Sequence, residues 1–196
     1  MKRLVNEDGF RGLKLYPTYQ QYFLNDPRIY PIYRTAQDLG IPVLIHTGSS
    51  IFQGTRLKYG DPLHLDDVAV DFPDLKLAMA HSGRGFWYDR AFFMSRLHKN
   101  VYMEISGLPP SRLLEYFPDL GRNADKVIFG SDWPGMPHMK RNIEAVAALP
   151  LPPDSWALIP KGYSGLSAFP PSIRSSAIIA TPNRCRSWKA RPIFRR

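Results

Sequence analysis

Five polar residues follow short apolar runs of this sequence, at points where the chain turns at a nearby glycine or proline. They are Lys14, His46, His81, Ser106 and Asp132, and successive members lie about thirty residues apart. Active sites of parallel α/β sheets lie at the carboxyl ends of the strands. We therefore expect Lys14, His46, His81 and Asp132 to line one rim of a parallel sheet.

Two imidazoles and one carboxylate in this set could bind a metal ion. His46, His81 and Asp132 would form a ligand set with open coordination positions, which activates a bound water for hydrolysis. The expected cofactor is a divalent ion, with Zn²⁺ as first choice because nitrogen and carboxylate ligands suit it. A hydrogen-bonding structural role is the competing interpretation for each histidine alone, but three matching positions favour a site. The other histidines do not share this placement: His64, His98 and His138.

The apolar runs themselves predict the strands that position these residues. They are apolar at successive positions, as expected for strands covered on both faces. Asp26-Pro27 and Asp61-Pro62 each place an N-cap before a proline, which predicts two helix starts. The expected strands span residues 12–15, 42–45, 75–80, 101–105 and 127–129. The expected helices span residues 26–39, 61–72, 87–99, 111–118 (with Ser111 as its cap) and 139–149.

This alternation predicts an α/β fold with a parallel sheet. An eight-unit barrel with this period needs about 250 residues, so five βα units make a little more than half of one. Two alternatives remain open: an open sheet, or a barrel from which units are missing.

The composition is that of a folded globular chain. Of its 196 residues, 44% are apolar, 22% charged and 13% aromatic, which argues against disorder, collagen and coiled coil. No apolar run reaches the roughly 20 residues of a membrane span, and polar residues follow Met1-Lys2-Arg3, where a signal peptide would be apolar. Cys185 is the single cysteine, which agrees with a reducing compartment. We expect a cytoplasmic protein with no membrane contact.

Basic charge is concentrated near the C-terminus. Residues 1–150 carry 18 Lys and Arg against 16 Asp and Glu, whereas residues 151–196 carry 8 against 1 and hold 7 of the 19 prolines. This predicts a folded body over 1–150 and a basic, poorly ordered tail over 151–196. Nucleic-acid binding would rest on the charge of the tail alone, without a binding motif, and is not expected.

Five stretches of the sequence resemble a known family. GLKLYP, PVLIHTG, MAHSGRGFWYDRAFF, VYMEISGLPP and VIFGSDWPG are similar to the amidohydrolase-related branch of the amidohydrolase superfamily, which includes the aminocarboxymuconate-semialdehyde decarboxylase-like enzymes. The similarity runs from Gly9 to Leu149 in the order of the family. Together the motifs are highly specific, whereas IHTG or GSDWP alone would be moderate evidence.

The resemblance implies a metal-dependent TIM barrel of which this chain holds βα units 4 to 8. It implies that His46 and Asp132, after the fifth and eighth strands, are metal ligands. His81, after the sixth strand, would orient or deprotonate the metal-bound water in a single-metal enzyme, or bind a second ion in a two-metal enzyme. Lys14 falls on the fourth strand, where two-metal relatives carry a carboxylated lysine and where this branch could use it to contact substrate.

Three further residues of these motifs are candidate substrate contacts, with packing or surface roles as the equal alternative. They are Arg84, Tyr88 and Trp133. The expected substrate is a small molecule, and a homo-oligomer is compatible with the sequence.

The resemblance also implies that this chain is a truncated member of the family, incomplete at its N-terminus. The family begins with a His-x-His pair that supplies two metal ligands, and the sequence contains no such pair. Three functions therefore stay open. The first is a metal-dependent hydrolase acting on an ester, lactone or amide. The second is a nonoxidative decarboxylase with the same ligands, and the third is an inactive remnant.

Overall fold

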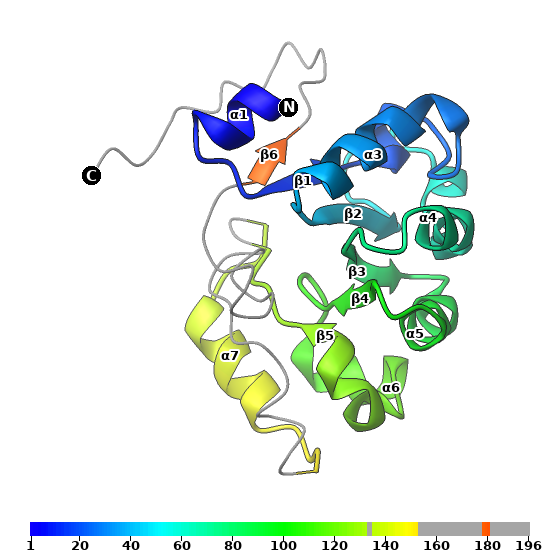
Figure 1. Ribbon diagram of the computed structural model, residues 1–196. Helices are drawn as coiled ribbons and strands as arrows, with labels where there is room; N and C mark the ends of the chain where they lie inside the picture. The colour runs from blue at the N-terminus through cyan, green and yellow to red at the C-terminus, as the bar shows by residue number, and fades with distance from the viewer. Residues whose placement is uncertain (133–134, 153–177, 181–196) are drawn as a thin grey trace.

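One open, parallel sheet organises the part of the chain that the computed structural model describes, residues 1–132, 135–152 and 178–180 (Figure 1). The strand order is β5-β4-β3-β2-β1-β6, and every neighbouring pair is parallel. The strands are β1 (Gly12–Leu15), β2 (Val43–Gly48), β3 (Leu77–Arg84), β4 (Val101–Glu104), β5 (Val127–Ile128) and β6 (Ile178–Ala180). The first five are the strands that the apolar runs predict.

Helices connect these strands, and those between β1 and β5 lie along one side of the sheet, on the right in Figure 1, whereas the helix after β5 lies at the lower left. After β1 to β5 in turn come α3 (Tyr30–Asp38), α4 (Leu65–Asp71), α5 (Tyr88–Leu97), α6 (Leu113–Tyr116) and α7 (Met139–Ala147). Two short helices were not predicted, α1 (Lys2–Asn6) and α2 (Pro17–Gln20). The 3₁₀ helices are η1 (Pro27–Ile29), η2 (Leu57–Tyr59), η3 (Pro62–His64), η4 (Pro110–Arg112) and η5 (Leu120–Lys126). No helix in these described ranges is long and apolar enough to cross a bilayer.

Both Asp-Pro pairs begin helical structure, as the sequence predicts. The side chain of Asp26 accepts a hydrogen bond from the backbone N of Arg28 at 2.9 Å, and that of Asp61 accepts one from Leu63 at 3.0 Å. Each cap opens a 3₁₀ turn, and the α-helix follows it. The prediction that Ser111 caps a helix is wrong: Ser111 lies inside η4, because Pro110 already holds the φ angle of a first helical residue.

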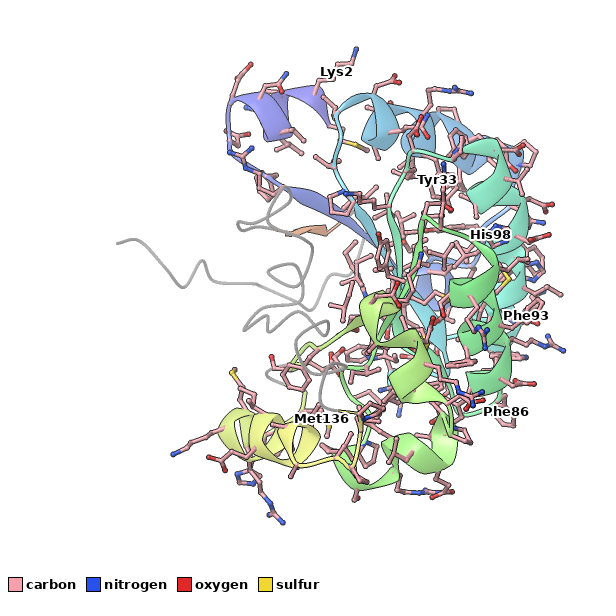
Figure 2. The ribbon with its side chains drawn as sticks, turned by 60° about the horizontal axis from the view of Figure 1, so that its bottom comes forward. Lys2, Tyr33, Phe86, Phe93, His98 and Met136 are labelled. Carbon is pink, nitrogen blue, oxygen red and sulfur yellow. The ribbon has the colours of Figure 1, made fainter. Side chains whose placement is uncertain are left out.

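The two faces of the sheet carry different side chains. On the face toward the helices, apolar residues of the strands join the main core; Figure 2 shows Phe86 and Phe93 on the outer side of this helical layer. On the other face Leu44, Ala78, Ala80 and Ile128 form a separate small cluster. Because paired residues of neighbouring strands point the same way, the register puts three charged or titratable residues on this second face. They are Lys14 beside Leu44, and His46 and Glu104 on either side of Ala80.

β6 extends the sheet where the sequence predicts no strand. Residues 178–180 pair in parallel with Gly12 to Lys14 of β1. This segment belongs to the tail that was expected to be poorly ordered, and its short apolar run lies in Pro- and Ser-rich sequence that gives no periodic signal. Residues 153–177 and 181–196 of the tail lie outside the described residues.

Candidate active site

The carboxyl ends of β2 and β3 bring His46 and His81 together. Their rings lie edge to face with centroids 4.8 Å apart, and the two residues are 2% and 6% exposed. A register shift between His46 and Gly48 interrupts the pairing of these strands. His81 and Ser82 adopt φ angles of 65° and 43°. Since left-handed backbone is costly for residues other than glycine, such angles are typical of functional sites held in place by the surrounding fold.

Asp132 and Arg84 reach the same place, next to Gly107. A β-carbon on Gly107 would lie 2.7 Å from Asp132 Oδ2, 3.0 Å from Arg84 Nη1 and 3.1 Å from His81 Nδ1. Gly107 also has a φ angle of +68°, which favours glycine. The geometry thus gathers His46, His81 and Asp132 at one end of the sheet, as expected, and adds Arg84 to them.

Hydrogen bonds set which nitrogen of each imidazole carries the proton. Nδ1 of His81 lies 2.7 Å from the carbonyl oxygen of Ser106, and Nε2 of His46 lies 3.1 Å from that of Ser49. A carbonyl oxygen can only accept, so these two nitrogens donate. The lone pair therefore remains on Nε2 of His81 and on Nδ1 of His46. Each neutral ring keeps one nitrogen for a proton or a metal ion.

Burial keeps both imidazoles neutral. It lowers the pKa of His81 to about 3, and the positive charges of Lys14 and Arg84 act in the same direction. Burial likewise lowers the pKa of His46 far below its usual value, with His81 and Lys14 adding to the effect. Both histidines are thus unprotonated bases at neutral pH.

Lys14 and Glu104 bring buried charge to the same site. Burial lowers the pKa of Lys14 to about 8, although the charges of Glu104 and Asp132 oppose this shift. Burial raises the pKa of Glu104 to about 6, against the hydrogen bonds from Ser106 and the charge of Lys14. Partial burial also raises the pKa of Asp132, and Arg84 and Lys14 oppose it.

Glu104 is a site residue that the sequence reasoning missed. It is 1% exposed, and its carboxylate accepts hydrogen bonds from Ser106 Oγ at 2.7 Å and from Ser106 N at 3.0 Å. The available signal was a carboxylate inside an otherwise apolar strand, since glutamate is almost never fully buried without partners. As part of an apolar run, residues 101–105 predict a strand only.

Tyr16 is a second missed residue. Its ring centroid lies 4.2 Å from that of His46, and its hydroxyl lies 2.6 Å from Ser50 Oγ. The signal was its position directly after β1, at the strand end where the sequence singled out only Lys14. Tyr16 forms an aromatic wall beside the imidazole.

The other residues that the sequence analysis names differ from one another in their contacts. Arg84 ends β3 and donates through Nε and Nη2 to the carbonyl oxygen of Ser49 at 3.2 and 2.9 Å. Tyr88 stacks on Tyr116, with centroids 4.2 Å apart, and so packs α5 against α6. Trp133 lies outside the described residues. His98 pairs with Asp66 at 2.7 Å, in keeping with a structural role.

The donor set fits a divalent ion in part. Two neutral imidazoles, each with a free nitrogen, and a carboxylate are donors that such an ion prefers. However, no group of three His, Cys, Asp or Glu side chains that could hold a metal occurs within residues 1–132, 135–152 and 178–180. The described residues thus supply donors of the right chemistry without assembling a complete metal centre.

Comparisons with known proteins agree with the fold. The family model described as Amidohydrolase matches residues 1–175, which extends past residue 150. An uncharacterized TIM-barrel protein from Bordetella bronchiseptica is similar at 28% identity, with a TM-score of 0.68 over 81% of this chain and 57% of that one. A 5-carboxyvanillate decarboxylase from Novosphingobium aromaticivorans, solved with manganese and 4-hydroxy-3-methoxy-5-nitrobenzoic acid, is 16% identical, with a TM-score of 0.61 over 85% of this chain and 58% of that one.

A third similar structure is a 4-oxalomesaconate hydratase from Rhodopseudomonas palustris, which is 21% identical, with a TM-score of 0.57 over 81% of this chain and 55% of that one. This chain therefore spans less than two thirds of the length of each of these structures. The predicted fold class, part of a TIM-like α/β barrel, is confirmed.

Proposed function

We propose that this chain, which belongs to the amidohydrolase family, carries the hydrolytic site of a metal-dependent enzyme acting on a small-molecule ester, lactone or amide. The observation that carries the proposal is the pair of neutral imidazoles, His46 and His81, gathered with Asp132 and Arg84 at the carboxyl ends of parallel strands. A cytoplasmic location, a homo-oligomer and the absence of nucleic-acid binding remain predictions from the sequence.

Each group of the site has a chemical role in this reaction. A divalent ion would be held by His46 and Asp132 and would supply Lewis acidity and an activated water. In a single-metal site, where His81 is not a ligand, its Nε2 can take up a proton while Nδ1 stays bonded to Ser106. Because burial keeps its pKa near 3, His81 passes that proton on rather than retaining it. Arg84 and Lys14 place positive charge where an oxyanion develops.

Zinc and manganese are both candidates for the ion. The donor types favour Zn²⁺, whereas the decarboxylase from Novosphingobium aromaticivorans was solved with manganese. Both ions therefore belong in the test. Any ligand beyond His46, His81 and Asp132 would have to come from other residues, including those of a second copy of the chain.

Nonoxidative decarboxylation is the second candidate function. The observation that favours it is the positive charge of Arg84 and Lys14 beside two neutral imidazoles, since this environment suits the carboxylate of an acidic substrate. Decarboxylation also agrees with the similarity to a decarboxylase. The same ligands serve both reactions, so the substrate decides between them.

The test uses the full chain, stripped with a chelator and reloaded with Zn²⁺ or Mn²⁺. It is assayed with p-nitrophenyl acetate and a simple lactone, and separately for CO₂ release from a hydroxybenzoate, with His81→Asn as the control. Metal-dependent hydrolysis that falls about 100-fold or more in His81→Asn supports the proposal. CO₂ release with the same loss in the variant supports the second candidate instead. A folded, reloaded chain with neither activity overturns both and supports the inactive remnant.

A further inference from the structure

We propose that Glu104 and Ser106 form a positioning pair that keeps the proton of His81 on Nδ1 and its lone pair on Nε2. The catalytic meaning of this pair rests on the proposed function, because His81 belongs to that site. The proton arrangement itself rests only on contacts between buried residues. It also gives a role to Glu104 of the VYMEISG stretch, a residue that the proposed function does not use.

Ser106 contacts His81 through two of its oxygens. Its carbonyl oxygen lies 2.7 Å from His81 Nδ1, and its hydroxyl Oγ lies 3.4 Å from the same nitrogen. Two oxygens of one residue therefore face a single ring nitrogen. The carbonyl can only accept, but a hydroxyl can accept or donate according to where its proton points.

Glu104 decides where that proton points. Ser106 Oγ lies 2.7 Å from Glu104 Oε2, and Ser106 N lies 3.0 Å from Glu104 Oε1. An ionised carboxylate has only acceptor oxygens, so the hydroxyl must donate to it. The lone pairs of Oγ are then left toward His81, and both oxygens of Ser106 present acceptors to Nδ1. Nδ1 must carry the hydrogen.

Glycines at the neighbouring positions make room for this arrangement. A β-carbon on Gly130 would lie 2.2 Å from Glu104 Oε1, and one on Gly107 would lie 3.1 Å from His81 Nδ1. Any larger residue at Gly130 would displace the carboxylate from Ser106. The three members of the chain of contacts are all nearly inaccessible, with Glu104 1%, Ser106 6% and His81 6% exposed.

A purely structural role for Glu104, as the counter-charge of Lys14, is the competing explanation. Lys14 is the charged group whose attraction most lowers the pKa of Glu104. That role predicts a loss of stability when the carboxylate is removed but no change in the proton position of His81. The position of the proton is therefore the discriminating measurement.

The first measurement needs no variant. The full chain, labelled with ¹⁵N-histidine, is studied by long-range ¹H–¹⁵N correlation at pH 8, without metal or substrate, and the His81 signals are assigned by their loss in His81→Asn. We expect a pyrrole-like Nδ1 and a pyridine-like Nε2 for His81. The opposite pattern in the unmodified chain overturns the proposal.

The second measurement uses Glu104→Gln. The amide oxygen of the glutamine can still accept from Ser106 N, while its NH₂ donates to Ser106 Oγ and frees the hydroxyl proton to turn toward His81. We expect the Nε2 signal to move toward the pyrrole-like position, which reports a mixture of tautomers. Glu115→Gln removes an exposed carboxylate on α6 and should leave His81 unchanged.

Two further variants test the route through Ser106. In Glu104→Gln combined with Ser106→Ala the hydroxyl donor is absent, so the Nδ1-protonated form should return. Gly130→Ala displaces the carboxylate without changing its charge and should act like Glu104→Gln, which keeps the test open if the glutamine variant does not fold. A variant that folds by thermal unfolding yet leaves the His81 signals unchanged overturns the proposal. Since no turnover is needed, an inactive chain can still confirm the proton position.

Discussion

The rings of His46 and His81 lie edge to face, with centroids 4.8 Å apart, although the two residues belong to different strands. Each ring donates through one nitrogen to a backbone carbonyl, and burial lowers the pKa of both. The pair thus consists of two neutral bases in contact. A proton or cation bound at one ring disfavours a second charge on the other.

Replacing either histidine of this pair should weaken metal binding. We expect His46→Asn and His81→Asn each to raise the dissociation constant for Zn²⁺ or Mn²⁺ by about 10-fold or more, as loss of a ligand or of its orienting partner does. Titration calorimetry at pH 7.5 measures this. His138→Asn is the control, since His138 is exposed and precedes α7. Equal affinity in all three variants and the parent chain would remove both imidazoles from the metal site.

Gly107→Ala should weaken metal binding at the site as well as strain the backbone. Gly40→Ala is the matched control, because Gly40 has a φ angle of +63° but no atom within 4 Å of the added β-carbon. Both variants should lose about 1–2 kcal/mol of unfolding free energy through the left-handed backbone. Only Gly107→Ala, whose β-carbon would lie 2.7 Å from Asp132 Oδ2, should also lose metal affinity. Urea unfolding and calorimetry on both variants separate the two effects; equal metal affinity in both would contradict the crowding argument.

Lys14 should make stability depend on pH in alkaline solution. Folding lowers its pKa from 10.5 to about 8, so between these values the folded state binds fewer protons than the unfolded state. Burial of the Lys14 ammonium therefore lowers the unfolding free energy by its full amount below pH 8, and this loss disappears as the pH rises toward 10.5. Lys14→Met should exceed the parent chain in stability by up to about 3 kcal/mol at pH 7, and the gap should narrow by pH 10. A gap that is constant over this range would show that Lys14 is not held at a lowered pKa.

Asn100→Ala should destabilise the fold without touching the site. The buried amide Nδ2 of Asn100 lies 3.2, 3.0 and 3.1 Å from the carbonyl oxygens of Ala69, Phe72 and Leu75, and so closes the C-terminal end of α4. Its loss leaves buried acceptors without a donor, which costs about 2–3 kcal/mol. Urea unfolding measures it, with Asn142→Ala, which removes an exposed hydrogen bond to the carbonyl oxygen of Pro137, as control. A loss no larger than that of the control would mean that water replaces the amide.

A chain that ends at Pro152 should keep the fold of the body. Among the residues that the structure describes, those of the main core cluster and the side chains packed on it lie between Met1 and Leu151. Removing the basic segment also removes β6, so the free edge of β1 should lower the unfolding temperature without abolishing cooperative unfolding. Circular dichroism during heating checks this. Loss of cooperative unfolding would show that the tail is an essential part of the fold.

The sequence by itself determined the five principal strands and the placement of His46, His81 and Asp132 at their ends. An apolar run bounded by glycine or proline is a local signal, and parallel strands share one direction, so their carboxyl ends meet at one rim. The Asp-Pro helix starts were local in the same way. The three residues between each cap and its α-helix form a 3₁₀ turn, which is frequent at helix N-termini.

Only the tertiary structure decided which atoms of this rim touch. The role of Glu104 depends on Ser106 and Gly130, and the tautomer of His81 depends on a carbonyl in the turn after β4. Gly107 is required by side chains of β3 and of the loop after β5. β6 is visible only through its pairing with β1. Such features depend on contacts between residues far apart in the chain, and a local pattern of residue types carries no information about the distance between them.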